Sequence, residues 1–296
     1  MTTDRHVVLE PGDYPGLFQA ADRASLAGQG RYLRAVRARL ILSVLAATSA
    51  AFTFKAGPAD WAAVATALCF VGTLGVEVLV LRGRPSQTWY QGRALAESAK
   101  TLTWRYAVGG HPFPPELSTS EADERFTQRL GALRNDLASV PILPTHAPAI
   151  SCTMRTVRKS SLAERRHAYL SGRIEEQSAW YANKALFHQK RADLYRIITI
   201  SFEIAGIVGA LSRAFGLILF DLAGIVAAVI AALAAWSVTR QHAATAEAYV
   251  VANHDLGLIR ERLGHQTAND SWAEAVANAE AAISREHSTW RSSHSE

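Results

Sequence analysis

Hydrophobic and polar residues are sharply segregated along the chain. Charged residues are nearly absent from four apolar runs and crowd the stretches between them; the runs are residues 40–54, 61–81, 197–212 and 214–236. A membrane-spanning helix needs about 20 apolar residues, with a range of about 17 to 25. The second and fourth runs meet this requirement, and the first meets it if Arg37 and Arg39 snorkel toward the headgroups. We therefore predict an all-α membrane protein with four spans, arranged as two transmembrane helical hairpins.

The residues between the runs predict how each hairpin turns. Between the first two runs, Gly57-Pro58 ends one helix and Asp60 can cap the next. The third and fourth runs are separated only by Arg213, so we expect a very tight turn between the last two spans.

The stretches outside the runs predict long helices that continue the spans. Apolar residues recur at helical spacing after Ser86, and capping-box signals at Ser118 and Ser161 open two more helices. The helix from Ser161 runs into the third apolar run, another helix follows the fourth run as far as Gly264, and Ser271 opens a last one. We predict that these helices form a cytoplasmic stalk.

A Pro-rich stretch, PILPTHAP, lies near the middle of the chain and predicts a linker. The two flanking halves share one layout, which is a cytoplasmic helix, a span, a tight turn, a span and a cytoplasmic helix. We therefore predict a first two-transmembrane domain at 1–139, a linker at 140–160 and a second two-transmembrane domain at 161–296.

Basic residues near the ends of the runs predict the orientation of the protein in the membrane. Those on one side are Arg31, Arg34, Arg37, Arg39, Arg82, Arg84, Arg93, Lys100, Lys184, Lys190, Arg191, Arg196 and Arg240, and those on the other are Lys55 and Arg213. This bias predicts a multi-pass protein of the inner (cytoplasmic) membrane with both termini in the cytoplasm. It also explains the net charge of +5 and the pI of about 9.4 through anionic lipid headgroups, so a nucleic-acid partner is not needed.

Motifs of catalysis are missing from the sequence. There is no Gly-rich phosphate loop, no HExxH zinc motif and no GxSxG nucleophile elbow, and the ten histidines show no spacing typical of a metal site. The two cysteines cannot form a disulfide framework, and no cleavable signal peptide is recognisable at the start. We therefore predict a protein that is not an enzyme and that has no cofactor.

Three carboxylates interrupt the apolar runs: Glu77, Glu203 and Asp221. An ionised group inside the hydrocarbon costs roughly 2.5–3.5 kcal/mol. The helical rise places Asp221 about 10 Å from the outer end of its predicted helix. These three residues are candidate pore-lining groups, because subunits that surround a pathway would repeat them as rings that select cations.

The alternative is that the carboxylates are satisfied within the chain. Glu77 would then pair with Arg82 or Lys100, Glu203 would pair with Arg196, and a neutral Asp221 would form hydrogen bonds between helices.

Small residues follow one another at four-residue spacing in the last two runs. Such residues let helices approach closely in lipid. The candidate packing positions are Gly206, Ala210, Gly224, Ala227, Ala228 and Ala231. They predict either tight packing within one hairpin or, in addition, contacts between subunits of a homo-oligomer.

Charged and aromatic residues next to the spans resemble those of the SLATT superfamily, the SMODS and SLOG-associating two-transmembrane effector domains. The matching residues are Trp89, Arg93, Glu97, Lys100 and Trp104 in the first half and Arg165, Tyr169, Arg173, Gln177, Trp180, Tyr181 and Lys184 in the second. Because both halves match, the chain looks like a tandem of two such domains.

The resemblance implies a pore-forming or membrane-perturbing effector of prokaryotic conflict (antiviral) systems. It also implies a nucleotide second messenger or a nucleotide-sensing protein as partner, and it brings no catalytic residues. We therefore predict an oligomeric, ion-conducting effector gated through its cytoplasmic helices. The alternative is a non-conducting membrane scaffold that recruits a cytoplasmic partner, and a small transporter is disfavoured because the spans lack midplane Gly/Pro interruptions.

Overall fold

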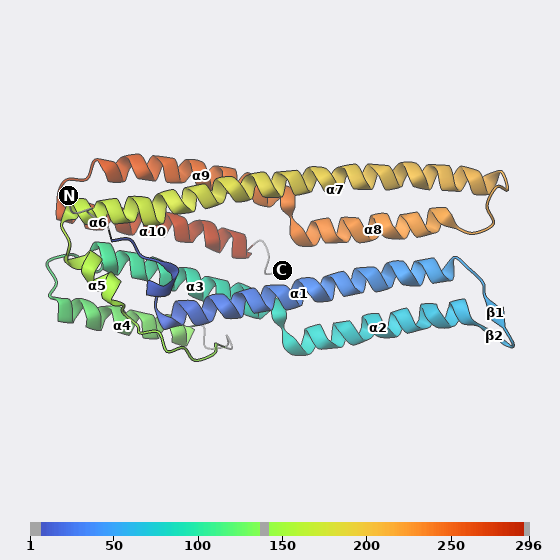
Figure 1. Ribbon diagram of the computed structural model, residues 1–296, viewed down its shortest axis with the longest axis horizontal. Helices are drawn as coiled ribbons and strands as arrows, with labels where there is room; N and C mark the ends of the chain where they lie inside the picture. Colours follow the sequence, from blue (N-terminus) through green and yellow to red (C-terminus); the bar gives the residue numbers. More distant parts are fainter. Residues whose placement is uncertain (1–6, 137–141, 293–296) are drawn as a thin grey trace, which may run out of the picture. The chain divides into compact units, whose positions relative to one another are not determined.

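The computed structural model describes residues 7–136 and 142–292 (Figure 1). Its elements are η1 (Pro11–Asp13), α1 (Gly16–Ala50), β1 (Lys55–Ala56), β2 (Ala59–Asp60), α2 (Trp61–Gly83), α3 (Pro85–Val108), α4 (Thr119–Asp136), α5 (Cys152–Lys159), α6 (Leu162–Tyr169), η2 (Leu170–Glu175), α7 (Glu176–Ala214), α8 (Leu222–Arg240), α9 (His242–Gly264) and α10 (Asn269–Ser292). The all-α class is thus confirmed. The predicted linker at 140–160 contains α5, and the only strands in the described residues form the two-residue pair β1–β2.

The chain divides into two compact units, and each unit draws on both halves of the sequence. The first, called the core unit here, comprises residues 1–29, 86–183 and 248–296. The second, called the apolar unit, comprises residues 30–85 and 184–247.

The joint after the second helix of each hairpin has the same backbone geometry in both halves. Arg84 follows α2 with φ of 40°, and Gln241 follows α8 with φ of 44°. Each donates its backbone N–H to the carbonyl four residues earlier, that of Val80 at 2.9 Å and that of Ser237 at 2.8 Å. Left-handed backbone is uncommon outside glycine. Because left-handed backbone occurs at the equivalent position of each half, it supports the layout that the two halves share.

The turn of the first hairpin follows the sequence prediction at Asp60 but not at Gly57-Pro58, because α1 already ends at Ala50 and Gly57-Pro58 joins β1 to β2. β1 pairs with β2 in an antiparallel register that sets Lys55 opposite Asp60. The Asp60 carboxylate then accepts hydrogen bonds from the N–H groups of Ala62 at 3.0 Å and Ala63 at 3.5 Å, which caps α2.

The turn of the second hairpin differs from the prediction of a very tight turn at Arg213. α7 continues to Ala214, and residues 215–221 form a loop in which Gly216 has φ of 73°. α8 therefore begins at Leu222, well inside the fourth apolar run.

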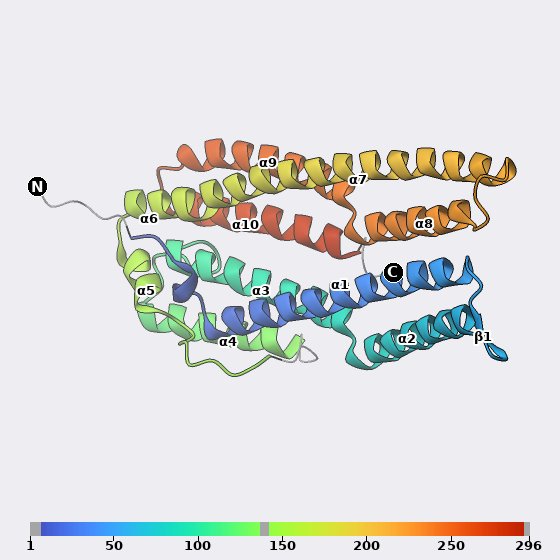
Figure 2. The same ribbon diagram turned by 45° about the vertical axis from the view of Figure 1, so that its right-hand side comes forward.

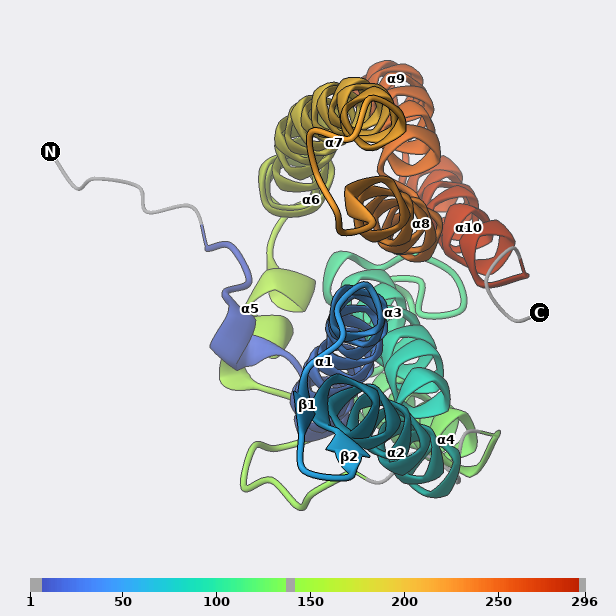
Figure 3. The same ribbon diagram turned by 90° about the vertical axis from the view of Figure 1, so that its right-hand side faces the viewer.

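Three helical stretches of the described chain are long and apolar enough to cross a membrane: Trp61–Val108, Leu162–Ala214 and Leu222–Gly264. α1, which contains the predicted first span, is not among these three stretches, and it ends at Ala50 and not at residue 54. Within the apolar unit, α1 lies beside α8 (Figure 3). In the loops beyond these helices, Phe52 stacks on Phe220 with ring centroids 5.3 Å apart.

The core unit contains one large hydrophobic core that both halves build together. From the C-terminal half, α10 packs against α3, and its Trp272 Nε1 donates to the Val108 carbonyl at 2.8 Å. The N-terminal part of α7 lies beside α9 (Figure 2), where Trp180 and Tyr249 meet at 5.2 Å between ring centroids and Ser178 bonds to Asn253. These contacts hold α7 and α9 together within the core unit.

Candidate functional site

Two of the three carboxylates in the apolar runs are paired with arginines. Glu77 Oε2 lies 2.8 Å from Arg39 Nη1 of α1. The sequence analysis had instead expected Arg82 or Lys100 as the partner of a paired Glu77. This ion pair joins the two helices of the first hairpin.

The placement of Asp221 inside a span is wrong. Asp221 is the N-cap of α8, where its carboxylate accepts from Gly224 N–H at 3.2 Å and pairs with Arg213 at 2.9 Å. Aspartate is a preferred N-cap because it satisfies N–H groups that the helix leaves free, and this preference starts the helix after Asp221.

Glu203 is the carboxylate that the single chain does not satisfy. It is exposed on α7, and its side chain has no hydrogen bond or ion pair with any described residue. The expected partner Arg196 lies 3.9 Å from Asp193 instead. The neighbours Ile200, Ile204 and Ile207 are about half exposed or more, so an unpaired carboxylate lies on an apolar helix face.

The small residues of α7 and α8 fall into two groups. A methyl group at Gly206 would lie 3.3 Å from Val226 Cγ1, and one at Gly209 would lie 3.1 Å from Leu222 Cδ2. These glycines let α7 and α8 approach within the hairpin, and Gly209 was missed by the sequence analysis. Ala228 is half-buried, whereas the remaining candidates are exposed: Ala210, Gly224, Ala227 and Ala231.

A buried ion pair lies at the centre of the core unit. Arg173 Nε and Nη2 each donate to a carboxylate oxygen of Glu280 at 2.9 Å, and the two side chains are 1% and 0% exposed. The hydroxyls of Tyr169 and Thr101 also donate to this carboxylate, both at 2.9 Å. Burial lowers the pKa of Arg173, but the Glu280 carboxylate more than offsets this, so the net shift is upward.

The resemblance pointed to Tyr169 and Arg173, but Glu280 and Thr101 were missed. A signal for Glu280 exists in the sequence, since it stands beside the core positions Val276, Ala279 and Ile283 on the apolar stripe of α10. Arg173 lies in η2, a π-helical insertion between α6 and α7.

Arginines also satisfy the C-terminal end of α3. Arg158 Nη1 donates to the carbonyls of Tyr106 at 3.2 Å and Phe113 at 2.8 Å, and Arg165 Nη1 donates to Val108 at 3.1 Å. The carbonyls of Tyr106 and Val108 lie in the last turn of α3, at the negative end of its dipole, and that of Phe113 lies in the loop that follows. Burial lowers the pKa of both arginines.

The other residues that carry the family resemblance are mostly structural in their contacts. In the first half, Trp104 donates to the Tyr14 hydroxyl at 3.0 Å and Lys100 lies 5.8 Å from the Tyr14 ring. Arg93 pairs with Glu97 at 2.8 Å, and Trp89 stacks on Tyr90. In the second half, Trp180 and Tyr181 pack on Tyr249, Lys184 lies 5.7 Å from the Phe187 ring, and Gln177 is half-buried.

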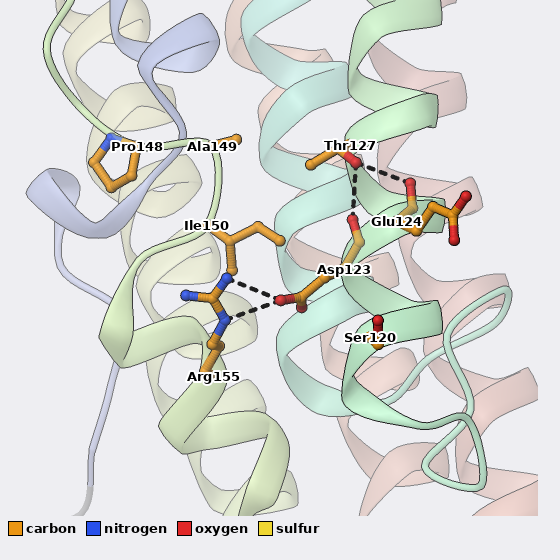
Figure 4. A pocket seen from close by; sticks show the side chains of 8 residues that line it. All are labelled: Ser120, Asp123, Glu124, Thr127, Pro148, Ala149, Ile150 and Arg155. Atoms are coloured by element: carbon orange, nitrogen blue, oxygen red, sulfur yellow. Dashed lines mark hydrogen bonds and ion pairs between the residues drawn. The ribbon is translucent and has the colours of Figure 1, made fainter.

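One surface hollow of about 610 Å³ lies in the core unit (Figure 4). It is lined by Ser120, Asp123, Glu124, Thr127, Pro148, Ala149, Ile150 and Arg155. Inside it, Arg155 Nε and Nη2 donate to one Asp123 oxygen at 3.0 and 2.8 Å, and the Tyr106 hydroxyl donates to the other. The Asp123 carboxylate is thus satisfied by the chain itself. Within the described residues, no group of three or more His, Cys, Asp or Glu side chains is placed to hold a metal ion.

Two family models match the chain side by side. SMODS and SLOG-associating 2TM effector domain 3 (SLATT_3) matches residues 15–166, and SMODS and SLOG-associating 2TM effector domain 1 (SLATT_1) matches residues 169–290. A search of curated proteins and a search of solved structures each found no match. The expected tandem is confirmed: the chain belongs to the SLATT family and carries two SLATT domains, one after the other.

Proposed function

We propose that the protein is a homo-oligomeric, ion-conducting membrane effector of a conflict system. The observation that carries the proposal is the exposed, unpaired Glu203 on the apolar face of α7. A SLATT domain is a 2TM effector domain, which is consistent with action at a membrane. The proposal requires no catalytic group and no cofactor.

The energetics of Glu203 favour assembly. In a lone chain this carboxylate would face lipid, at a cost of roughly 2.5–3.5 kcal/mol. Copies of the chain arranged around a water-filled pathway remove that cost, because each Glu203 then faces water and its symmetry mates. A ring of carboxylates in surroundings of low dielectric attracts cations. Glu77 and Asp221 are paired with arginines and play no part in this ring.

Replacing Glu203 by glutamine is expected to weaken cation selectivity while the assembly stays intact. Glutamine keeps the shape of the side chain and removes its charge. Reversal potentials of purified protein in proteoliposomes, measured across an asymmetric KCl gradient, report the cation-to-anion permeability ratio. Glu203→Asp keeps the charge and is the matched control, for which we expect a ratio close to that of the unmodified protein.

An unchanged ratio in Glu203→Gln would remove this residue from the pathway. Flux that is absent from the unmodified protein, even with a nucleotide second messenger or a nucleotide-sensing partner added, would favour the non-conducting scaffold.

The exposed small residues of α8 are proposed to pack between subunits. Ala227→Leu and Ala231→Leu add bulk where helices approach, so each is expected to shift the assembled species in mild detergent toward monomer. Mass photometry or light scattering measures this shift. Ala228→Leu lies on the half-buried face of the same helix and serves as the control. If Ala227→Leu and Ala231→Leu leave the oligomer unchanged, these small residues do not pack between subunits.

Both termini and the core unit are proposed to lie on the cytoplasmic side of the inner membrane. Cys152 is exposed at the start of α5 in this unit. A membrane-impermeant thiol reagent is therefore expected to label Cys152 after cell lysis and not in intact cells. Labelling of intact cells would reverse the orientation.

A further inference from the structure

Two guanidinium groups flank one buried tryptophan in the apolar unit. Trp236 lies in α8 near its C-terminal end and is 9% exposed. The guanidinium carbon of Arg37 in α1 lies 4.9 Å from its ring centroid, and that of Arg240 lies 5.9 Å away. The indole face attracts both cations, which holds them near each other.

A third arginine and two histidines complete the cluster. Arg191 of α7 lies 5.4 Å from the Phe187 ring, and its charge acts on both Arg240 and His242. The Nδ1 atoms of His188 and His242 are 3.0 Å apart, so one ring donates to the other.

This cluster has no anion within the described chain. None of the three arginines has a carboxylate within 4 Å or a side-chain hydrogen bond to a described residue. The positive charges of the cluster add to the effect of burial on the pKa values of its members. Burial, His242, Arg240 and Lys184 together lower the pKa of His188 to about 4. Burial lowers the pKa of Arg240, and Arg37 and Arg191 add to this shift.

A hydroxyl donor and an apolar surface adjoin the cluster. Tyr195 accepts a hydrogen bond from Trp236 Nε1 at 2.8 Å, and its own proton has no acceptor among the described residues. Leu194 and Ile197 on the same helix are 42% and 63% exposed. The cluster stands where polar sequence gives way to the apolar part of α7 and where α8 ends, which is the level of lipid headgroups.

We propose that Arg37, Arg191 and Arg240, with the Tyr195 hydroxyl, bind the phosphate of an anionic phospholipid. The proposal rests on the membrane placement proposed above and not on conduction. Guanidinium groups suit phosphate because they present several donors in one plane. Basic pockets between membrane helices on the cytoplasmic side bind such headgroups. The exposed Leu194 and Ile197 favour a lipid over a free phosphate, because they offer an acyl chain its contact.

The test is a lipid titration of the purified full-length protein in mild detergent, read by native mass spectrometry. Phosphatidylglycerol is expected to bind more tightly than phosphatidylcholine. Arg37→Gln and Arg240→Gln are each expected to weaken phosphatidylglycerol binding about fivefold and to leave phosphatidylcholine binding unchanged. Arg82→Gln is the matched control, since Arg82 occupies the last turn of α2 as Arg240 occupies that of α8, and its effect is expected to stay within about twofold.

Equal losses in Arg82→Gln and Arg240→Gln would overturn the site, because the effect would then follow overall charge. Equal binding of the two lipids by the unmodified protein would overturn it as well. Displacement of phosphatidylglycerol by equimolar glycerol 3-phosphate would assign the site to a soluble phosphate and overturn the lipid. Because the readout is lipid binding alone, a protein that conducts no ions but discriminates the lipids contradicts the proposed pore and leaves this site standing.

Discussion

Replacing Glu280 by alanine is expected to lower the free energy of unfolding by about 3–5 kcal/mol. The change leaves the Arg173 guanidinium, 1% exposed, without its carboxylate, and it removes the acceptor of the Tyr169 and Thr101 hydroxyls. An uncompensated buried charge is among the most costly defects a core can carry. Denaturant unfolding in mild detergent, followed by tryptophan fluorescence, measures the loss.

Two variants separate this effect from general damage. Glu97→Ala removes one partner of the more exposed Arg93–Glu97 pair and is expected to cost about 1 kcal/mol or less. The double change Arg173→Met with Glu280→Leu is expected to recover most of the loss, because apolar residues of similar volume can replace a buried pair. A small effect of Glu280→Ala, similar to that of Glu97→Ala, would contradict the role assigned to the ion pair.

Trp104→Ala is expected to cost about 3–5 kcal/mol of stability. Trp104 is 0% exposed, meets the Tyr169 ring at 5.8 Å between centroids and donates to the Tyr14 hydroxyl. Its removal leaves a cavity under η2 and takes a hydrogen bond from Tyr14. The same unfolding measurement applies.

Trp89→Ala is the matched control for this change. Trp89 lies on the same helix and carries the same family resemblance, but it is only half-buried. We expect it to cost distinctly less than Trp104→Ala. Equal losses would show that the measured cost does not follow burial at these two positions.

Local signals in the sequence located several helix starts. The capping box at Ser161 is formed as predicted: its hydroxyl accepts from Glu164 N–H at 3.3 Å, and the Glu164 carboxylate accepts from Ser161 N–H at 2.8 Å. Ser118 and Glu121 form the equivalent contacts before α4. Such caps depend on two residues that are three positions apart in the chain, so the sequence alone identifies both partners.

The sequence analysis placed the start of the last span too early, because a hydropathy pattern does not show where a helix cap interrupts an apolar run. The segment 214–220 is apolar enough to extend the span, yet it forms a loop that ends at the N-cap Asp221. The ion-pair partners of Glu77 and Arg173 could not be predicted from the sequence, for a different reason. They depend on how helices far apart in sequence face each other, and no local pattern encodes that register.

The core that both halves build has a consequence for the synthesis of the chain. The Val108 carbonyl and its partner Trp272 are 164 residues apart. At about 5–20 residues per second, a ribosome needs roughly 8 to 33 s to make the intervening stretch. Until then the aromatic face of α3 has no α10 to cover it. A nascent first half therefore emerges with its core open, and this core can close only after α10 has been made.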